Sequence, residues 1–401
     1  MGSVVTLRID KFDLDWGKNE SFIDHSVLYS ETDVKKEYYY YAENQRIKKN
    51  ALSRRLIELK DTLELLGYSL KNIRRRFQEL CANHKRYSGT PVPLDYRTFH
   101  DGLIQLRPEL VESHADEEFP DDHGFYKYFK YSLKEKLRLT SENYHNLHDE
   151  FFDSIHPYIV LRILIENPAN HERSVIWGYQ DILNGGWISK KGLFQSTASL
   201  ANFLIVTEGS SDTHVIRKSL EILNPGISKF FRFVDMQENY PFTGTGNLYN
   251  FVKGLSRIGM VMNVLVVFDN DAEGSDKFDK CQTELQLPAN IRVSKLPNLK
   301  SLRKFRTIGP SGSKISNING TAASIECFLD LTYQNTTPAS VRWKTYNERS
   351  NAYQGALQNK EKFVSLFLKM RSPYADYDFE KLRLLNQHII RECIAINETP
   401  L

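Results

Sequence analysis

The spacing of hydrophobic residues changes near position 193. Before it, apolar residues recur every three or four positions, as on one face of a helix, and Leu52, Leu56, Leu59, Leu63 and Leu66 form the clearest run. This spacing predicts helices over residues 51–79, 99–111, 125–139, 143–165 and 172–183. Residues 4–16 alternate instead, which predicts a small hairpin. The first 195 residues should therefore form a mostly helical domain behind a short β element.

Beyond position 193, short apolar runs alternate with helical stretches. The runs cover residues 203–206, 230–234, 264–268 and 291–293, and the helical stretches between them cover 213–223, 248–258 and 275–285. Strand–helix alternation is typical of a mostly parallel sheet with helices on both faces. After residue 332 the chain is charged and helical again, over 352–370 and 379–396. We therefore predict three domains: a helical one at 1–195, an α/β domain at 196–335 and a helical extension at 336–401.

Composition narrows the possible partners and location. The net charge of +3 is small for 401 residues, so any nucleic-acid surface must be a local patch. The four cysteines form no close pair, which argues against a disulfide framework or a zinc ribbon and fits a reducing compartment. The chain starts without a signal-peptide pattern, and no apolar run has membrane-spanning length. We expect a cytoplasmic protein with no membrane partner.

Acidic residues follow two of the predicted strands. The run at 203–206 leads to Glu208, turns at Gly209 and reaches Asp212 on the first turn of the next helix; the run at 264–268 leads to Asp269 and Asp271. In open α/β sheets, functional groups collect at the carboxyl ends of the strands. The four carboxylates should therefore lie close together.

Close carboxylates repel one another, and the sequence around them offers too few cations to neutralise them. Mg²⁺ or Mn²⁺ would do so, because these ions prefer carboxylate oxygens, water and phosphate as ligands. Each acid pair could alternatively cap the helix that follows it. That alternative does not explain why two separate strands both end in acids, so we favour a metal site.

These residues carry a family resemblance. Glu208-Gly-x-x-Asp212 and Asp269-x-Asp271-x-x-Gly274, each after an apolar strand, resemble the Toprim fold shared by topoisomerases, bacterial primases and OLD-family nucleases. Residues 317–329 resemble the OLD-type extension, in which an acid that opens a late helix joins the metal ligands. The start of the chain, with residues 15–18 and the tyrosines at 38–41, is similar to the N-terminal module of HEPN/Toprim-associated proteins, which are bacterial and linked to anti-phage defence.

The resemblance implies a role for each acid. Glu208 would be a metal ligand and a general acid or base, Asp269 and Asp271 would bind metal, and Asp212 and Glu326 would complete a second metal position. Two ions roughly 4 Å apart would then hold the attacking water and the leaving oxygen of a phosphodiester. For Glu326, the alternative is again a first-turn helix acid.

OLD-type sites also use a lysine from the C-terminal part to stabilise the charge that develops on the phosphate. Lys360 and Lys362 are the candidates in this sequence, and Lys360 is the one we assign to catalysis. An ordinary surface lysine is the alternative for each.

A basic stretch separates the second acid pair from Glu326. No acidic residue occurs between Glu284 and Glu326. A phosphate backbone needs such an acid-free track beside an acidic site. The residues assigned to this track are Lys295, Lys300, Arg303, Lys304, Arg306 and Lys314, and residues 309–313 are expected to form a loop near the substrate.

The most economical hypothesis is a divalent-metal-dependent nuclease that hydrolyses phosphodiesters of DNA or tRNA-like RNA as an effector of anti-phage defence. The N-terminal domain would serve recognition, homodimer formation or restraint. We find no ATPase motif, although OLD-type nucleases often carry an ATPase domain, and this leaves open whether a partner protein supplies regulation. Two rivals stay open. One is a metal-independent HEPN ribonuclease that uses Arg138 with His145 or Arg107 with His114. The other is a non-catalytic toxin or regulator that binds nucleic acid or a partner.

Overall fold

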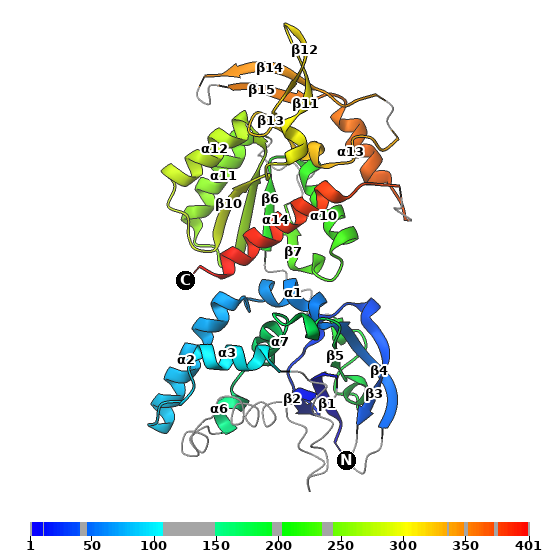
Figure 1. Cartoon of the computed structure of the whole chain (residues 1–401), viewed down its shortest axis with the longest axis vertical. Helices are drawn as coiled ribbons and strands as arrows, with labels where there is room; N and C mark the ends of the chain where they lie inside the picture. Colours follow the sequence, from blue (N-terminus) through cyan, green and yellow to red (C-terminus); the bar gives the residue numbers. More distant parts are fainter. Residues whose placement is uncertain are drawn as a thin grey trace. The chain divides into compact units, whose positions relative to one another are not determined.

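The computed structural model describes residues 2–10, 12–40, 46–106, 149–194, 203–234, 244–334, 337–348, 352–372 and 376–399. The chain divides into two compact units, Met1–Leu200 and Ala201–Leu401 (Figure 1). None of the helices in the described ranges combines the length and apolar content needed to cross a bilayer.

The first unit is built on a five-stranded antiparallel sheet in the order β2-β1-β5-β4-β3. Its strands are β1 (Val4–Ile9), β2 (Phe12–Lys18), β3 (Val34–Tyr40), β4 (Arg46–Arg55) and β5 (Ser174–Trp177). The predicted hairpin is confirmed as β1–β2. The helices predicted over 51–55 and 174–177 are wrong, because these residues pair as neighbouring strands, with Leu52 opposite Trp177 and both side chains fully buried.

Helices pack beside this sheet and follow the remaining helical patterns in part. They are α1 (Lys60–Leu65), α2 (Leu70–Ser88), α3 (Tyr96–Ile104), α6 (Asp149–Asp153), α7 (Pro157–Leu164) and α8 (Gln180–Asn184), with short 3₁₀ turns η1 (Ser26–Leu28), η2 (Glu31–Asp33), η3 (Leu56–Leu59), η5 (Pro168–Asn170) and η6 (Gly192–Phe194). Gly67 separates α1 from α2 with φ +87°, a conformation that favours glycine. Pro157 divides the helix predicted over 143–165 and begins α7. The helix predicted over 125–139 lies outside the described residues. The unit is thus mixed α and β, and not the mostly helical domain that we expected.

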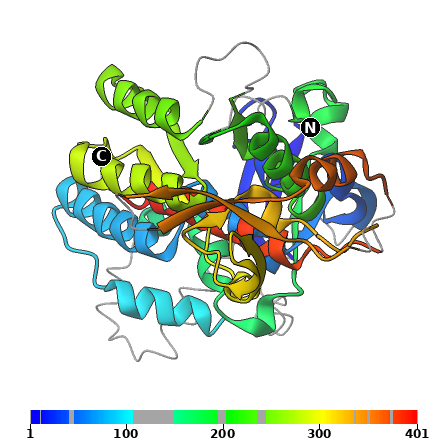
Figure 2. The same cartoon turned by 90° about the horizontal axis from the view of Figure 1, so that it is seen from above.

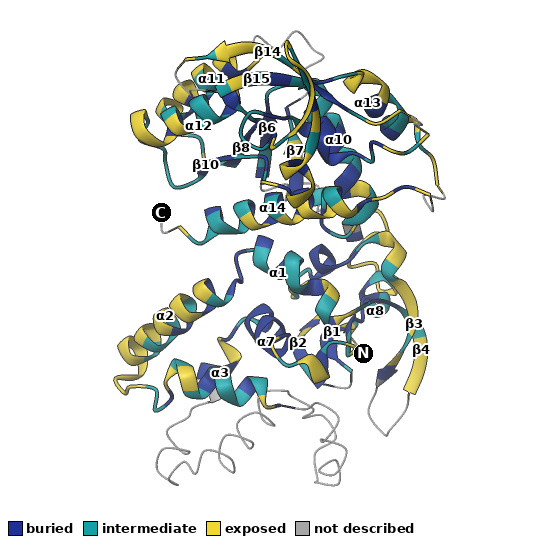
Figure 3. Cartoon of the chain, turned by 45° about the horizontal axis from the view of Figure 1, so that its top comes forward, coloured by how far each residue is buried: buried dark blue, intermediate teal, exposed yellow. Residues whose placement is uncertain are grey.

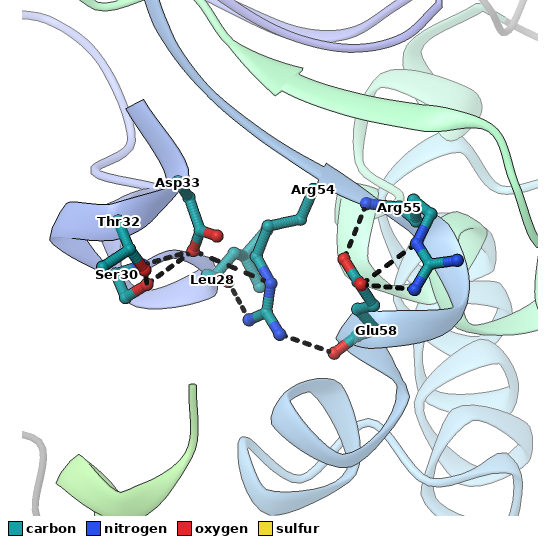
Figure 4. A network of polar contacts seen from close by, with 7 residues as sticks. All are labelled: Leu28, Ser30, Thr32, Asp33, Arg54, Arg55 and Glu58. Atoms are coloured by element: carbon teal, nitrogen blue, oxygen red, sulfur yellow. Dashed lines mark hydrogen bonds and ion pairs between the residues drawn. The ribbon is translucent and has the colours of Figure 1, made fainter. Parts of the chain in front are cut away.

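Arg54 and Arg55, which fall in the helix predicted over 51–79, lie instead at the end of β4, and both have carbonyl or carboxylate partners (Figure 4). Arg54 donates to the carbonyl oxygens of Leu28, at 3.0 Å, and Glu58, at 3.2 Å. Arg55 forms ion pairs with Glu58 and Glu172 at 2.7 and 3.0 Å. These contacts tie the end of β4 to the segments around it, which is a structural use of the two arginines.

The second unit contains the predicted parallel sheet, in the order β10-β8-β6-β7. Its strands are β6 (Phe203–Thr207), β7 (Phe231–Phe233), β8 (Asn263–Phe268) and β10 (Ile291–Lys295), and the helices that follow are α10 (Ser210–Leu223), α11 (Thr245–Ile258) and α12 (Ala272–Glu284). Every strand and helix predicted between 203 and 293 is confirmed to within a few residues. Alternate residues of β8 are buried on opposite faces, which is why the strand appears as a continuous apolar run.

Both faces of the parallel sheet are covered. On one face, Val264, Val266 and Phe268 pack in a core with Leu248 and Val252 of α11. The other face is covered by α10 and by α14 (Glu380–Asn397), which contacts β8, β10 and α10. The dark strands at the centre of Figure 3 mark this core. The predicted helix at 379–396 is therefore confirmed as part of the same unit.

A second, four-stranded sheet replaces structure that we predicted as loop and helix. Its order is β12-β11-β14-β15, from β11 (Phe305–Gly309), β12 (Gly312–Ser316), β14 (Val341–Asn347) and β15 (Ala352–Leu357). Residues 309–313 form the tight turn of the β11–β12 hairpin, in which Gly312 has φ +96°. The helix predicted over 352–370 starts only at α13 (Lys360–Lys369). The strand before it packs closely, because a Cβ at Gly355 would lie 2.7 Å from side-chain carbons of Ala322 and Val341.

Short elements connect the two sheets of the second unit. β9 (Asn270–Asp271) pairs with β13 (Ala322–Ala323), and η7 (Ser228–Phe230), η8 (Lys300–Arg303) and η9 (Ile325–Phe328) are 3₁₀ turns. Figures 1 and 2 show β14 and β15 as a long two-stranded ribbon. β15 contacts both β13 and α12. The ribbon thus reaches the carboxyl end of the parallel sheet, where the acids lie.

Candidate metal centre

The first two acids lie side by side because their strands are neighbours. Thr207 of β6 is opposite Val267 of β8, so Glu208 and Asp269 leave the sheet at the same edge. The backbone N–H of Asp269 donates to the Glu208 carboxylate at 3.0 Å. The second carboxylate oxygen of Glu208 accepts from the hydroxyl of Thr245, at the start of α11, at 2.9 Å.

The other acids of the two motifs sit at helix starts. Asp212 lies in the first turn of α10 and accepts from the Gly209 N–H at 3.0 Å. Asp271 precedes α12 and accepts from the Gly274 N–H at 2.8 Å. These are the capping contacts of the alternative interpretation. They coexist with the clustering of the acids.

Glu326 reaches the same place through the β13–β9 pair. Ala322 is opposite Asp271, and the Gly320 N–H donates to the Asn270 carbonyl at 2.9 Å. This pairing holds η9 beside the end of the parallel sheet. Glu326 is only 3 % exposed, and its carboxylate accepts from the Ser324 hydroxyl at 2.5 Å.

The electrostatics show that the five carboxylates act on one another. Burial, followed by the charges of Glu326 and Glu208, raises the pKa of Asp212 to about 8. Burial, followed by the charge of Asp271 among the neighbouring acids, raises the pKa of Glu208 to about 7. Burial also raises the pKa of Asp271. The cluster therefore cannot be fully ionised at neutral pH without a cation.

Asp269 lies at the centre of this repulsion. Burial and the charges of Asp212, Glu208, Asp271 and Glu326 hold its pKa well above the usual range. Within the described residues, no side chain or backbone N–H donates a hydrogen bond to its carboxylate. A partly buried carboxylate among four others and without a donor is an anion that lacks its counter-charge.

The donor set suits a hard divalent cation, since all five candidate ligands are carboxylates. In the described part of the chain, however, no three His, Cys, Asp or Glu side chains are placed to hold a metal ion. Four of the acids are bonded instead to nearby N–H or O–H donors. An ion would therefore bind only after these side chains turn from their present partners.

Gly274 shows why the second motif ends in glycine. A Cβ at this position would lie 2.2 Å from the backbone carbonyl oxygen of Asp269, which is too close for any side chain. The helix start at α12 can approach the strand end only without that carbon. Gly209, in the first motif, has extended backbone and meets nothing closer than 3.7 Å, so its geometry does not require glycine.

Lys360 is the first residue of α13, and its ammonium lies 3.7 Å from the Glu326 carboxylate. Its positive charge also lowers the pKa of Asp212, against the effect of burial. Lys362 lies two residues further along the same helix. The structure thus places the predicted catalytic lysine beside the acid cluster.

Gln354 is a site residue that we did not predict. Its side-chain oxygen accepts from the N–H groups of Ala272, at 2.9 Å, and Glu273, at 3.2 Å, and its amide nitrogen donates to the Asp271 carboxylate. Gln354 therefore links the start of α12 to Asp271, one of the candidate metal ligands. The residue escaped prediction because it lies on β15, where the spacing indicated a helix.

The predicted basic track is mostly at the surface. Lys295 is partly buried and donates to the Ser275 hydroxyl at 3.3 Å, so it supports the start of α12. The other five are exposed: Lys300, Arg303, Lys304, Arg306 and Lys314. The Arg107/His114 and Arg138/His145 pairs of the rival ribonuclease lie outside the described residues.

Comparison with known proteins bears on the N-terminal unit. The sequence model of the family described as HEPN/Toprim N-terminal domain 1 matches residues 1–200, the range of the first compact unit. Comparison with curated proteins found no match, and comparison with solved structures found none either. The match confirms the resemblance noted at the start of the sequence, and the chain belongs to the HEPN/Toprim-associated proteins.

Proposed function

We propose that the protein is a divalent-metal-dependent nuclease whose active site is the acid cluster of the second unit. Membership of the family suggests a nuclease-like or defence-associated role, and an effector of anti-phage defence fits both. The observation that carries the proposal is Asp269, a carboxylate among four others without a donor in the described residues. A bound cation would satisfy it.

Glu208, Asp269 and Asp271 would hold one Mg²⁺ or Mn²⁺ ion, and Asp212 and Glu326 a second. When bound, such ions activate water and stabilise charge on a phosphate. Glu208, at the end of β6 beside Asp269, would also serve as the general acid or base that the family resemblance implies. The Lys360 ammonium, beside Glu326, would balance the negative charge of the phosphate.

The test is cleavage of plasmid, single-stranded DNA and tRNA by the purified chain with Mg²⁺ or Mn²⁺. Asp269→Asn and Glu208→Gln should each lower the rate by roughly a hundredfold or more, since each removes a ligand charge. Asp279→Asn, an exposed acid of α12, is the matched control and should cut normally.

Cleavage that continues in EDTA, or in Asp269→Asn, would contradict the proposal. In that case His145→Ala and His114→Ala would test the N-terminal ribonuclease. Binding of all three nucleic acids without cleavage in either metal would favour the non-catalytic alternative.

A further inference from the structure

The sheet formed by β12, β11, β14 and β15 carries no acidic residue on any of its four strands. Four cations lie on it: Arg306, Lys314, Arg342 and Lys344. All four are exposed. The net charge of the chain is small, but the charged residues of this sheet are all positive. They create a local positive potential that favours binding of an anion.

Strand register divides these residues between two faces. Thr307 is opposite Val341, which is opposite Leu357, and all three are buried, so this face packs inward. On the other face, Ile308 is beside Arg342, which is opposite Ala356. Because side chains alternate along a strand, Arg306 and Gln354 belong to this second face.

We call this second face the arginine face; it comprises Arg306, Ile308, Ile315, Arg342 and Gln354. Ile315 is opposite Arg306 and is 65 % exposed, although it is apolar. Neither arginine forms an ion pair with a carboxylate within the described ranges. The face thus offers two guanidinium groups and an uncovered apolar side chain.

The arginine face leads directly to the acid cluster. Gln354 lies two residues from Ala356 on β15, and its amide nitrogen donates to the Asp271 carboxylate. Three residues after β15 ends, α13 begins at Lys360, the partner of Glu326. A ligand lying along the face would therefore meet the acids at Gln354.

We propose that the arginine face is the surface on which the nucleic-acid strand lies as it enters the acid cluster, with Arg306 and Arg342 on its phosphates. The inference rests on the proposed function of that cluster. An acidic site repels a polyanion, so the substrate needs cations close to the acids that are not already paired with them. Guanidinium groups suit this role because they bind phosphate oxygens in pairs. Exposed Ile315 would contact sugars or bases.

Register also distinguishes the two charged residues of the β11–β12 hairpin. Lys314 is opposite Thr307, so its side chain starts on the inward face. The two faces of the β11–β12 hairpin should therefore contribute differently to nucleic-acid affinity, although Arg306 and Lys314 are both exposed. This separates two residues that sequence alone places in a single track.

The experiment measures binding of fluorescent single-stranded DNA, single-stranded RNA and duplex DNA to the full chain in EDTA, over a series of salt concentrations. Arg306→Gln with Arg342→Gln should weaken binding of the single strands about tenfold. It should also lower the slope of log affinity against log salt by roughly 1.4, that is, about 0.7 for each lost phosphate contact. The control, Lys253→Gln with Arg257→Gln on exposed α11, removes the same charge and should change affinity less than twofold.

Equal weakening by both double variants would overturn the inference, because net charge alone would then explain binding. No effect of the arginine variants, or no binding by the wild type, would overturn it too. Arg306→Lys with Arg342→Lys should keep part of the affinity, and thermal melts check that each variant is folded. If the wild type cleaves, and the arginine variants bind and cut normally, only this inference is wrong and the proposed function stands. If binding depends on the arginines but the wild type does not cleave, only the proposed function is wrong.

Discussion

At the scale of single residues, Asp269 is the central carboxylate of the candidate metal centre. Sequence reasoning could predict its position, because an acid after a buried apolar strand must lie at the sheet edge. Sequence reasoning could not predict that the backbone N–H of Asp269 donates to the Glu208 carboxylate. Nor could it predict that the Asp269 carboxylate has no hydrogen-bond donor in the described residues. Hydrogen-bond partners such as Thr245 depend on which helix start is nearby, and that is a property of the fold.

The raised pKa values predict how stability without metal depends on pH. Glu208 and Asp212 have pKa values of about 7 and about 8, above those of ordinary carboxyls. Below about pH 3, under the ordinary pKa values of 3.8 for Asp and 4.5 for Glu, these groups are protonated in both folded and unfolded chains, so their contribution to stability is fully present. As pH rises to 8, the folded state must ionise them against burial and repulsion, and that contribution is lost.

The melting temperature in EDTA should therefore fall by several degrees between pH 5 and pH 8.5. Added Mn²⁺ should restore it at pH 8, because a cation stabilises the ionised acids. Asp212→Asn should flatten the pH dependence, whereas Asp279→Asn should leave it unchanged. A melting temperature that rises over this range would show that the acids are not repelling one another.

Gly274 makes a second prediction at this scale. Gly274→Ala places a Cβ against the Asp269 backbone and should lower the free energy of unfolding by about 2 kcal/mol or more. Gly254→Ala is the control: it lies in α11 with nothing within 4 Å, and it should raise stability by ~0.5–1 kcal/mol through helix propensity. Urea denaturation of both variants measures the difference. Equal effects would mean that the strand end and α12 are not closely packed.

At the scale of elements, prediction succeeded where the local pattern matched the tertiary environment. The strands and helices from 203 to 293 are short, regular and buried on both faces, so their apolar runs indicate them directly. It failed for β4, β5 and β15, where strand pairing overrides a helical spacing of apolar residues. Leu52 and Trp177 face each other across a sheet whose strands are distant in sequence. Pairing between strands that are distant in sequence cannot be detected from the spacing of apolar residues in one short segment.

The last described helix, α14, is attached to α10 by polar contacts of Asn386. Asn386 accepts from the Ser219 hydroxyl at 2.7 Å and donates to the Asn224 side chain at 2.9 Å. Asn386→Ala would remove the donor to the Asn224 side chain and leave the Ser219 hydroxyl with the Ile216 carbonyl alone, and it should cost about 1–3 kcal/mol in unfolding free energy. The exposed neighbour Gln387→Ala should have almost no effect. Equal stability of both variants in urea would show that α14 is held by apolar packing alone.

At the scale of the whole molecule, the chain separates the family-defining part from the chemistry. The family match covers the first unit, whereas all five acids and Lys360 lie in the second. Sequence reasoning placed domain boundaries near 195 and 335. The structure has two compact units that divide at residue 200, and β15 and α14 belong to the second.

This division predicts that residues 201–401 fold alone. The isolated fragment should melt cooperatively and bind Mn²⁺ with an affinity within a few-fold of that of the full chain, because every ligand candidate is retained. The measurement is calorimetric titration beside a thermal melt. The same fragment carrying Asp269→Asn is the control and should bind weakly. A fragment that melts without cooperativity would show that the second unit depends on the first.

The distance of α14 from the acids along the chain has a consequence for biosynthesis. Residues 380–397 are synthesised after every strand of the parallel sheet, yet they cover one face of that sheet, whose strands end at Glu208 and Asp269. A nascent chain in which α14 has not yet emerged would leave this face of the sheet bare to solvent. The proposed nuclease would therefore reach its complete fold only after α14 has been made.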